Sequence, residues 1–258
     1  MKKIIIGNWK MNPENLTLAR KIFSEIKKLS KKFPKIDIVV CPPFVYLSDL
    51  KNKIDKASSL KLGAQDVFWD NPETGSRPFT GEISASMLRD AGVKYVILGH
   101  SERRGMGETN EDVNKKIKIA LAAGLTPIIC VGEKEHDIDG KFFETLKIQI
   151  KDTLNKIKKA DLQKIIIAYE PIWAIGKSES ESMKGEDLYQ MAIFIRKILS
   201  EMFGQVEAFK TPIVYGGSVS PFNVKDIISQ GHVDGILAGR ASLESEKIAE
   251  IMDILAQI

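Results

Sequence analysis

The 258-residue sequence predicts an α/β protein, a single (β/α)8 barrel over residues 1–258. Three observations predict this fold. Eight short apolar runs are spread along the chain, helical patterns lie between most of them, and the length suits one α/β barrel of roughly 200–250 residues. An open, doubly wound sheet is the alternative, but its usual G-x-G-x-x-G fingerprint does not follow the first run.

The apolar runs are mostly continuous rather than alternating, as expected for strands that are covered on both faces. Each is predicted to be one strand of a parallel sheet. They are K-I-I-I-G at 3–7, I-D-I-V-V-C at 36–41, L-K-L-G-A-Q at 60–65, Y-V-I-L-G-H at 95–100, T-P-I-I-C-V-G at 126–132, K-I-I-I-A-Y-E at 164–170, T-P-I-V-Y-G-G at 211–217 and V-D-G-I-L-A-G at 233–239.

Apolar residues also recur at helical spacing, which predicts amphipathic helices between strands. The pattern covers residues 19–29, 113–121, 146–157, 188–202 and 248–255, and a short helix is expected at 45–52. Gly124 suits a helix end. The stretch F-W-D-N-P-E-T-G-S-R-P-F-T at 68–80 has no period and predicts a long loop after the third strand.

Composition argues against several functional classes. The net charge is +4, and residues 1–56 hold 13 Lys and Arg against 5 Asp and Glu, a local excess of +8 that leaves −4 for the rest. These lysines have no aromatic residues between them, so we expect a solvated helix face and no nucleic-acid partner. The cysteines Cys41 and Cys130 end apolar runs and suit a reducing, cytoplasmic location. No apolar stretch approaches the length of a membrane span, and the N-terminal run is too short for a signal peptide.

Polar residues stand just after several predicted strands, where a parallel barrel places its active site. A buried carboxylate such as Glu170 is costly unless it is paired or can neutralise. His136 and His232 share no ligand spacing with His100, so no metal is expected. Asp66 and Glu133 also follow strands and are interpreted as structural. The candidate site residues are Asn8, Lys10, His100, Ser101, Glu102, Glu170, Ser218, Gly239 and Arg240.

Glycines after the last two strands predict an anion site. Y-G-G-S at 215–218 and A-G-R-A-S at 238–242 occupy the loops that commonly bind phosphate in this fold, through free backbone N–H groups. The alternative is that these glycines only form tight turns.

The motifs together resemble the triosephosphate isomerase family, and the resemblance covers essentially the whole chain. The matching stretches are G-N-W-K-M-N at 7–12, C-P-P-F at 41–44, F-T-G-E at 79–82, V-I-L-G-H-S-E-R-R at 96–104, G-L-T-P-I-I-C-V-G-E at 124–133, A-Y-E-P-I-W-A-I-G at 168–176, V-Y-G-G-S-V at 214–219 and A-S-L at 241–243.

The resemblance implies a cofactor-independent isomerase that interconverts dihydroxyacetone phosphate and glyceraldehyde 3-phosphate. Glu170 would be the base, and His100 the electrophile that polarises the carbonyl. Lys10 and Asn8 would lie near the substrate, Glu102 would orient Lys10, and Ser101 would hold Glu170 in the open site. Backbone N–H groups of Gly176, Ser218, Gly239 and Arg240 would bind the phosphate. A neutral His100 at a helix N-terminus is also implied, a feature for which this family is the standard example.

The chain departs from the family pattern at a few positions. The lid hinge after Gly176 reads K-S-E-S-E-S without a second glycine, Arg240 stands where glycine is commoner, and the chain is about one residue short between Arg104 and Gly107. The 68–80 loop is longer, and the resemblance implies that it docks, with Thr80, into a second copy of the chain as a homodimer.

Two other functions are compatible with parts of this pattern. A phosphate-binding lyase or synthase barrel would share the glycine loops but not the set of Asn8, Lys10, His100 and Glu170. A non-catalytic phosphate-binding barrel or scaffold protein could use the basic first third on an acidic partner.

Overall fold

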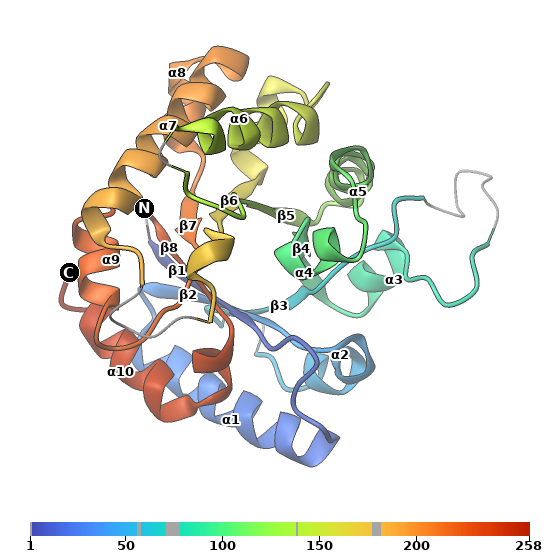
Figure 1. The fold of residues 1–258 in the computed structure, drawn as a ribbon. Coiled ribbons are helices and arrows are strands. Elements are labelled where there is room, and N and C mark those ends of the chain that lie inside the picture. The colour runs from blue at the N-terminus through green and yellow to red at the C-terminus, as the bar shows by residue number, and fades with distance from the viewer. Residues whose placement is uncertain (1, 56–57, 71–77, 138, 177–181) are drawn as a thin grey trace.

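Eight parallel strands close into a barrel. The computed structural model describes residues 2–55, 58–70, 78–137, 139–176 and 182–258. Each strand pairs with the next in the sequence and β8 pairs with β1, which confirms the predicted barrel and excludes the open sheet (Figure 1). The strands are β1 (Lys3–Asn8), β2 (Ile36–Cys41), β3 (Leu60–Ala64), β4 (Val93–Leu98), β5 (Thr126–Val131), β6 (Ile166–Tyr169), β7 (Ile213–Tyr215) and β8 (Gly235–Ala238).

Helices surround the strands (Figure 1). The α-helices are α1 (Leu16–Lys32), α2 (Phe44–Lys51), α3 (Ala85–Asp90), α4 (Ser101–Gly105), α5 (Asn110–Ala122), α6 (Lys141–Thr153), α7 (Gly185–Phe203), α8 (Gln205–Lys210), α9 (Val224–Ser229) and α10 (Ser245–Leu255). Short 3-10 helices are η2 (Lys159–Lys164), η3 (Ile172–Ala174) and η5 (Arg240–Leu243). Within these described ranges, no helix is long and apolar enough to cross a membrane.

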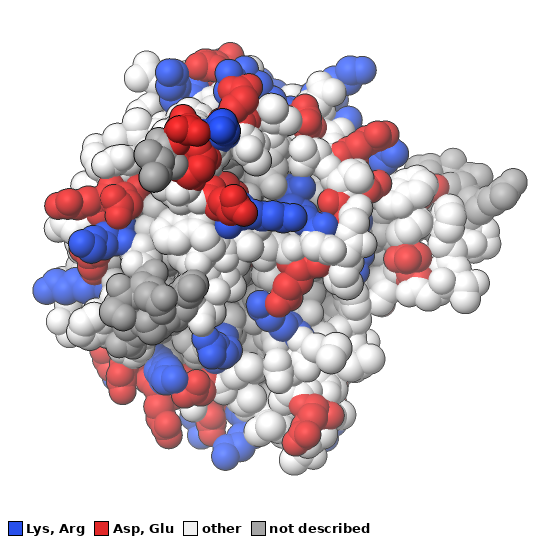
Figure 2. Space-filling view, in the orientation of Figure 1, with Lys and Arg blue, Asp and Glu red and all other residues white. Residues whose placement is uncertain are grey.

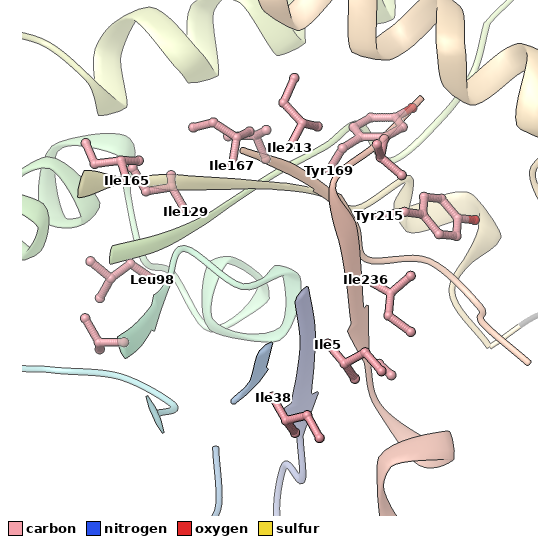
Figure 3. Packing of buried hydrophobic residues seen from close by; sticks show 14 of the residues in the cluster. Ile5, Ile38, Leu98, Ile129, Ile165, Ile167, Tyr169, Ile213, Tyr215 and Ile236 are labelled. Atoms are coloured by element: carbon pink, nitrogen blue, oxygen red, sulfur yellow. The ribbon is translucent and has the colours of Figure 1, made fainter. Parts of the chain in front are cut away.

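Alternate residues of most strands enter two different hydrophobic clusters. Ile4 and Ile6 of β1 belong to a cluster made of strand residues alone, which fills the barrel interior. Ile5 belongs to the larger cluster between the strands and the helices, part of which is drawn in Figure 3. Because both faces of the strands are buried, the apolar runs are continuous, as the sequence indicated.

Some helix predictions were incomplete or wrong. The predicted helix at 146–157 ends at Thr153, because Lys156 takes a left-handed φ of 59°. Leu154 and Ile157 remain buried from the turn that follows, and this burial extends the apolar period past the helix. The helices α3, α8 and α9 were not predicted, since six residues each are too few to show a 3.6-residue period.

Two predicted features lie partly outside the described residues. The 68–80 loop is described at 68–70 and 78–80, where the chain forms neither helix nor strand and extends away from the barrel beside α3 (Figure 1). The predicted lid hinge at 177–182 lies outside the described residues except for Ser182.

Candidate active site

Residues that are far apart in the sequence line one cavity at the carboxyl ends of the strands. Its volume is about 560 Å³. Most of the predicted site residues line it, and Glu170 approaches it through His100, whose Nε2 is 3.4 Å from Glu170 Oε1. The predicted residues in the lining are Asn8, Lys10, His100, Gly176, Ser218, Gly239 and Arg240.

Lys10 is held in an unusual backbone conformation beside the cavity. Its φ is 52°, a left-handed value that costs a non-glycine residue about 1–3 kcal/mol. The Lys10 N–H donates to Asn8 Oδ1 at 3.0 Å, and the Lys10 carbonyl accepts from Gln65 Nε2 at 2.8 Å. The Lys10 ammonium lies 2.6 Å from Glu102 Oε1. Because Glu102 is exposed, this ion pair orients Lys10 more than it stabilises the fold.

His100 is the N-cap of α4, so it stands at a helix N-terminus as the resemblance implied. Its Nδ1 accepts a hydrogen bond from the Glu102 N–H at 3.2 Å. An accepting Nδ1 places the ring proton on Nε2 and leaves the imidazole neutral. The Nε2–H then faces Glu170 Oε1 and the cavity, where it can donate to an oxygen.

Glu170 is buried and only partly satisfied. Its side chain is 2% exposed, and Oε2 accepts from the Ser101 N–H at 3.2 Å. Oε1 is buried without a hydrogen-bond partner among the described residues. Burial raises the pKa of Glu170 above its ordinary value, and His100, the Ser101 N–H, Cys130 and Lys10 oppose that rise. A carboxylate with one free oxygen and a raised pKa is suited to take a proton.

The glycines after β7 are required by close packing as well as by any anion. A Cβ on Gly216 would lie 2.7 Å from Glu170 Cγ, and one on Gly217 would lie 2.2 Å from the Tyr215 hydroxyl oxygen. Neither residue has a left-handed φ. Gly216 therefore lets the β7 loop lie against the base, and Gly217 lets the chain lie against Tyr215; the predicted anion site is compatible with this packing.

The segment after β6 is attached to the β7 loop through Ser218. The Gly176 N–H donates to Ser218 Oγ at 3.1 Å, and Ser218 Oγ donates to the Ala174 carbonyl at 3.1 Å. The N–H that was expected to bind phosphate is thus taken by a hydroxyl in this arrangement. Gly239 and Arg240 lie across the cavity, at the end of β8 and the start of η5.

Gln65 contributes to the site in a way that the sequence analysis missed, and Glu133 has the structural role that was expected of it. Gln65 holds both the Lys10 and Cys41 carbonyls, at 2.8 and 2.9 Å. Glu133 Oε1 accepts from the Tyr169 hydroxyl at 2.9 Å and from Trp173 Nε1 at 2.8 Å, so it anchors the segment that follows Glu170. Both follow strands, and that position was the available signal.

Asp66 is structural, as expected. It pairs with Lys116 at 2.7 Å and with Arg103 at 3.0 Å, and it does not line the cavity. In the part of the chain that the structure describes, no group of three or more His, Cys, Asp or Glu could hold a metal ion.

The fold and the cavity define a class of protein, a barrel enzyme that can hold a small anion beside a carboxylate base and two cationic or N–H donors. The family model described as Triosephosphate isomerase matches residues 3–255. The chain therefore belongs to the triosephosphate isomerase family.

Curated relatives carry the same name over nearly their whole length. The triosephosphate isomerase of Dictyoglomus thermophilum is 44% identical over 97% of this chain and 98% of its own. That of Geobacter metallireducens is 44% identical over 98% of each chain. That of Thermoanaerobacter pseudethanolicus is 41% identical over 98% of this chain and 99% of its own. These matches do not favour the lyase, synthase or scaffold alternatives.

Proposed function

We propose that Glu170, His100 and Lys10 carry out the interconversion of dihydroxyacetone phosphate and glyceraldehyde 3-phosphate, the reaction that the family membership assigns to this chain. The observation that carries this proposal is the approach of His100 Nε2 to Glu170 Oε1, at 3.4 Å beside the cavity that Lys10 lines. A base and an electrophile at that separation can act on two neighbouring atoms of one small substrate.

The reaction is a proton transfer between adjacent carbons. Glu170 takes a proton from C1 of the ketose, the C–H electron pair forms a C1–C2 double bond, and the carbonyl oxygen becomes an enediolate oxygen. The His100 Nε2–H and the Lys10 ammonium stabilise that charge. Protonation of C2 by Glu170 gives the aldose, with proton exchange between the two oxygens through His100.

Glu170 has to leave the Ser101 N–H to reach the substrate carbons. We interpret the contact at 3.2 Å as the resting position of the base. When the segment after β6 moves over a bound substrate, the Gly176 N–H exchanges Ser218 Oγ for a phosphate oxygen. The N–H groups of Ser218, Gly239 and Arg240 complete the phosphate site. This closure would exclude water from the enediolate.

A coupled assay tests the activity directly. Purified protein is expected to convert each triose phosphate into the other with no added metal or cofactor. In deuterated water the product should carry deuterium on carbon, because the proton on Glu170 exchanges with solvent. Isomerisation without any deuterium incorporation would contradict the enediolate route, and absence of isomerisation would contradict the function itself.

We also propose that residues 1–258 act as one barrel unit that forms a homodimer in the cytoplasm. Apolar side chains are exposed after the ends of β1, β2 and β4, with Met11 94%, Val45 at the start of α2 80% and Met106 after α4 72% exposed. Phe68 and Phe79 contact each other at 4.7 Å between ring centroids. They lie on an arm formed by the 68–80 loop, and the described residues of this arm, 68–70 and 78–80, are mostly uncharged (Figure 2). Thr80 follows this aromatic pair. Such exposed apolar surface supports a protein partner, and a second copy would place the arm near Lys10 and His100.

A further inference from the structure

The Glu133 carboxylate can accept more hydrogen bonds than it receives. Glu133 is 1% exposed, and its Oε1 accepts from both the Tyr169 hydroxyl and Trp173 Nε1. Its Oε2 is buried with no hydrogen-bond partner in the described chain. Because Trp173 lies three residues after Glu170, the Trp173 contact fixes the segment that carries the base.

His136 lies against this contact from the outside. Its Nδ1 is 3.6 Å from Glu133 Oε1, and its side chain is 41% exposed. The imidazole stacks on Phe142 with centroids 3.8 Å apart, and it meets the Trp173 ring edge-on at 5.5 Å. His136 thus touches both partners of the Trp173–Glu133 hydrogen bond and remains open to solvent protons.

Glu133 is the charged group that faces the ring. Lys134 and Glu135 in its own segment are exposed, and the Asp137 carboxylate accepts from the Lys141 and Phe142 N–H groups. On α6, the Lys141 ammonium pairs with Asp139. The η3 residues carry no titratable side chain. Among the residues that the structure describes, protonation of His136 would therefore create one new pair, with Glu133.

We propose that His136 is a positioning residue whose protonation holds Trp173 on Glu133 and so keeps Glu170 in its resting position on Ser101. An imidazolium would attract the Glu133 carboxylate, whose Oε1 lies 3.6 Å from the His136 Nδ1. It would also lie between the rings of Phe142 and Trp173, where cations are favoured. Histidine changes charge between about pH 5 and 8, so the resting arrangement gains population as the pH falls. The inference rests on the proposed role of Glu170 and adds a pH dependence to it.

The test observes Trp173 directly rather than through activity. Protein labelled with 5-fluorotryptophan gives a ¹⁹F resonance for Trp173, identified by its loss in Trp173→Phe. We expect this resonance to shift between about pH 8 and pH 5.5 in the wild type. The shift should be absent in His136→Phe, which keeps the aromatic stack, and in His136→Gln. It should persist in the matched control His232→Asn, since His232 contacts Tyr189 instead.

Kinetics give a second readout. As the pH falls from about 8 to about 6, kcat of the wild type should fall two- to fivefold more than kcat of His136→Phe, the size expected of a partly exposed ion pair. A Trp173 titration that is unchanged in both His136 variants would overturn the proposal even in an active isomerase. If the protein did not isomerise triose phosphates, the proposed function would fail, while the ¹⁹F titration would still report on His136.

Discussion

At the scale of single residues, Glu170 combines deep burial with an oxygen that has no hydrogen-bond partner in the described part of the chain. One carboxylate oxygen is held by the Ser101 N–H, and the other faces His100. Most buried polar atoms in proteins are hydrogen-bonded; Glu133 Oε2 is a further exception, and the Glu170 oxygen differs from it in lying beside His100. The unsatisfied oxygen raises the energy of the resting state and leaves a lone pair available to a substrate proton, which is the physical basis of the role assigned to Glu170.

The first prediction concerns the reach of that carboxylate. Glu170→Asp shortens the side chain by one methylene, so its oxygen should stand too far from the substrate carbons. A misplacement of this size is expected to lower kcat by about 10²-fold or more. The coupled assay at saturating substrate measures it, and equal kcat values for the two proteins would argue against Glu170 as the base.

The second prediction concerns stability and pH. Because burial raises the pKa of Glu170 in the folded protein, the ionised form is penalised by folding. This free-energy penalty is complete at a pH above the raised pKa. It disappears at a pH below the ordinary carboxyl pKa, where Glu170 is protonated in both the folded and the unfolded protein. Glu170→Gln should therefore raise the melting temperature at pH 8, by a few degrees, and this gain should shrink in acid. Calorimetry of both proteins across that range measures it, and a gain that grew in acid would have the wrong sign.

At the scale of elements, the ends of β5 and β6 are interlocked. The Glu170 N–H donates to the Val131 carbonyl at 2.8 Å. A Cβ on Gly132 would lie 1.8 Å from the Glu170 carbonyl oxygen, which is a backbone clash that cannot relax by rotating a side chain. The position of the base is therefore set by the strand beside it as much as by its own strand.

The third prediction follows from this contact. Gly132→Ala should displace the end of β6, lower kcat/KM by about 10²-fold and destabilise the protein by about 2 kcal/mol or more. The matched control is Gly105→Ala, since a Cβ there meets nothing within 4 Å. Gly105 ends α4, so alanine should be neutral or stabilising by about 0.5–1 kcal/mol. Denaturant unfolding and the coupled assay separate the two variants, and similar losses in both would refute the packing argument.

At the scale of the whole molecule, three strongly exposed apolar residues follow the carboxyl ends of strands. Met11 follows Lys10 after β1, Val45 lies in α2 after β2, and Met106 follows α4 after β4. If a second copy covers this surface, the site geometry depends on assembly. The association constant and the turnover number would then change together.

The fourth prediction tests that link. Phe79→Asp combined with Thr80→Arg should place charges in the proposed interface, shift the protein from dimer to monomer in sedimentation and lower kcat. The control is Val206→Asp, which changes another exposed apolar residue, 60% exposed against 39% for Phe79, on α8 away from the arm (Figure 1). A double variant that remained dimeric, or a monomer with full activity, would contradict the proposed assembly.

The fold was predictable because the strands have an unambiguous sequence signal. Each is a short apolar run that is mostly covered on both faces, so most strands appear as continuous blocks. The short helices α3, α8 and α9 give no such signal, and the end of α6 depends on the backbone of Lys156. The spacing of apolar residues along the sequence identifies long helices and strands. It cannot distinguish the end of a helix from an apolar turn that stays buried.

Two glutamates show what the sequence determined and what only the tertiary structure decided. Glu133 follows β5 and Glu170 follows β6, and both are almost fully buried. The sequence by itself determined that a carboxylate ends each strand and that the strands meet at one rim. Each keeps one oxygen without a hydrogen-bond partner among the described residues, and only the folded chain decided that Glu133 Oε1 receives two donors while the free oxygen of Glu170 lies beside His100. The donors to Glu133 and the His100 ring belong to other strands and their loops. The different surroundings of the two carboxylates therefore depend on distances between strands, which no local sequence pattern encodes.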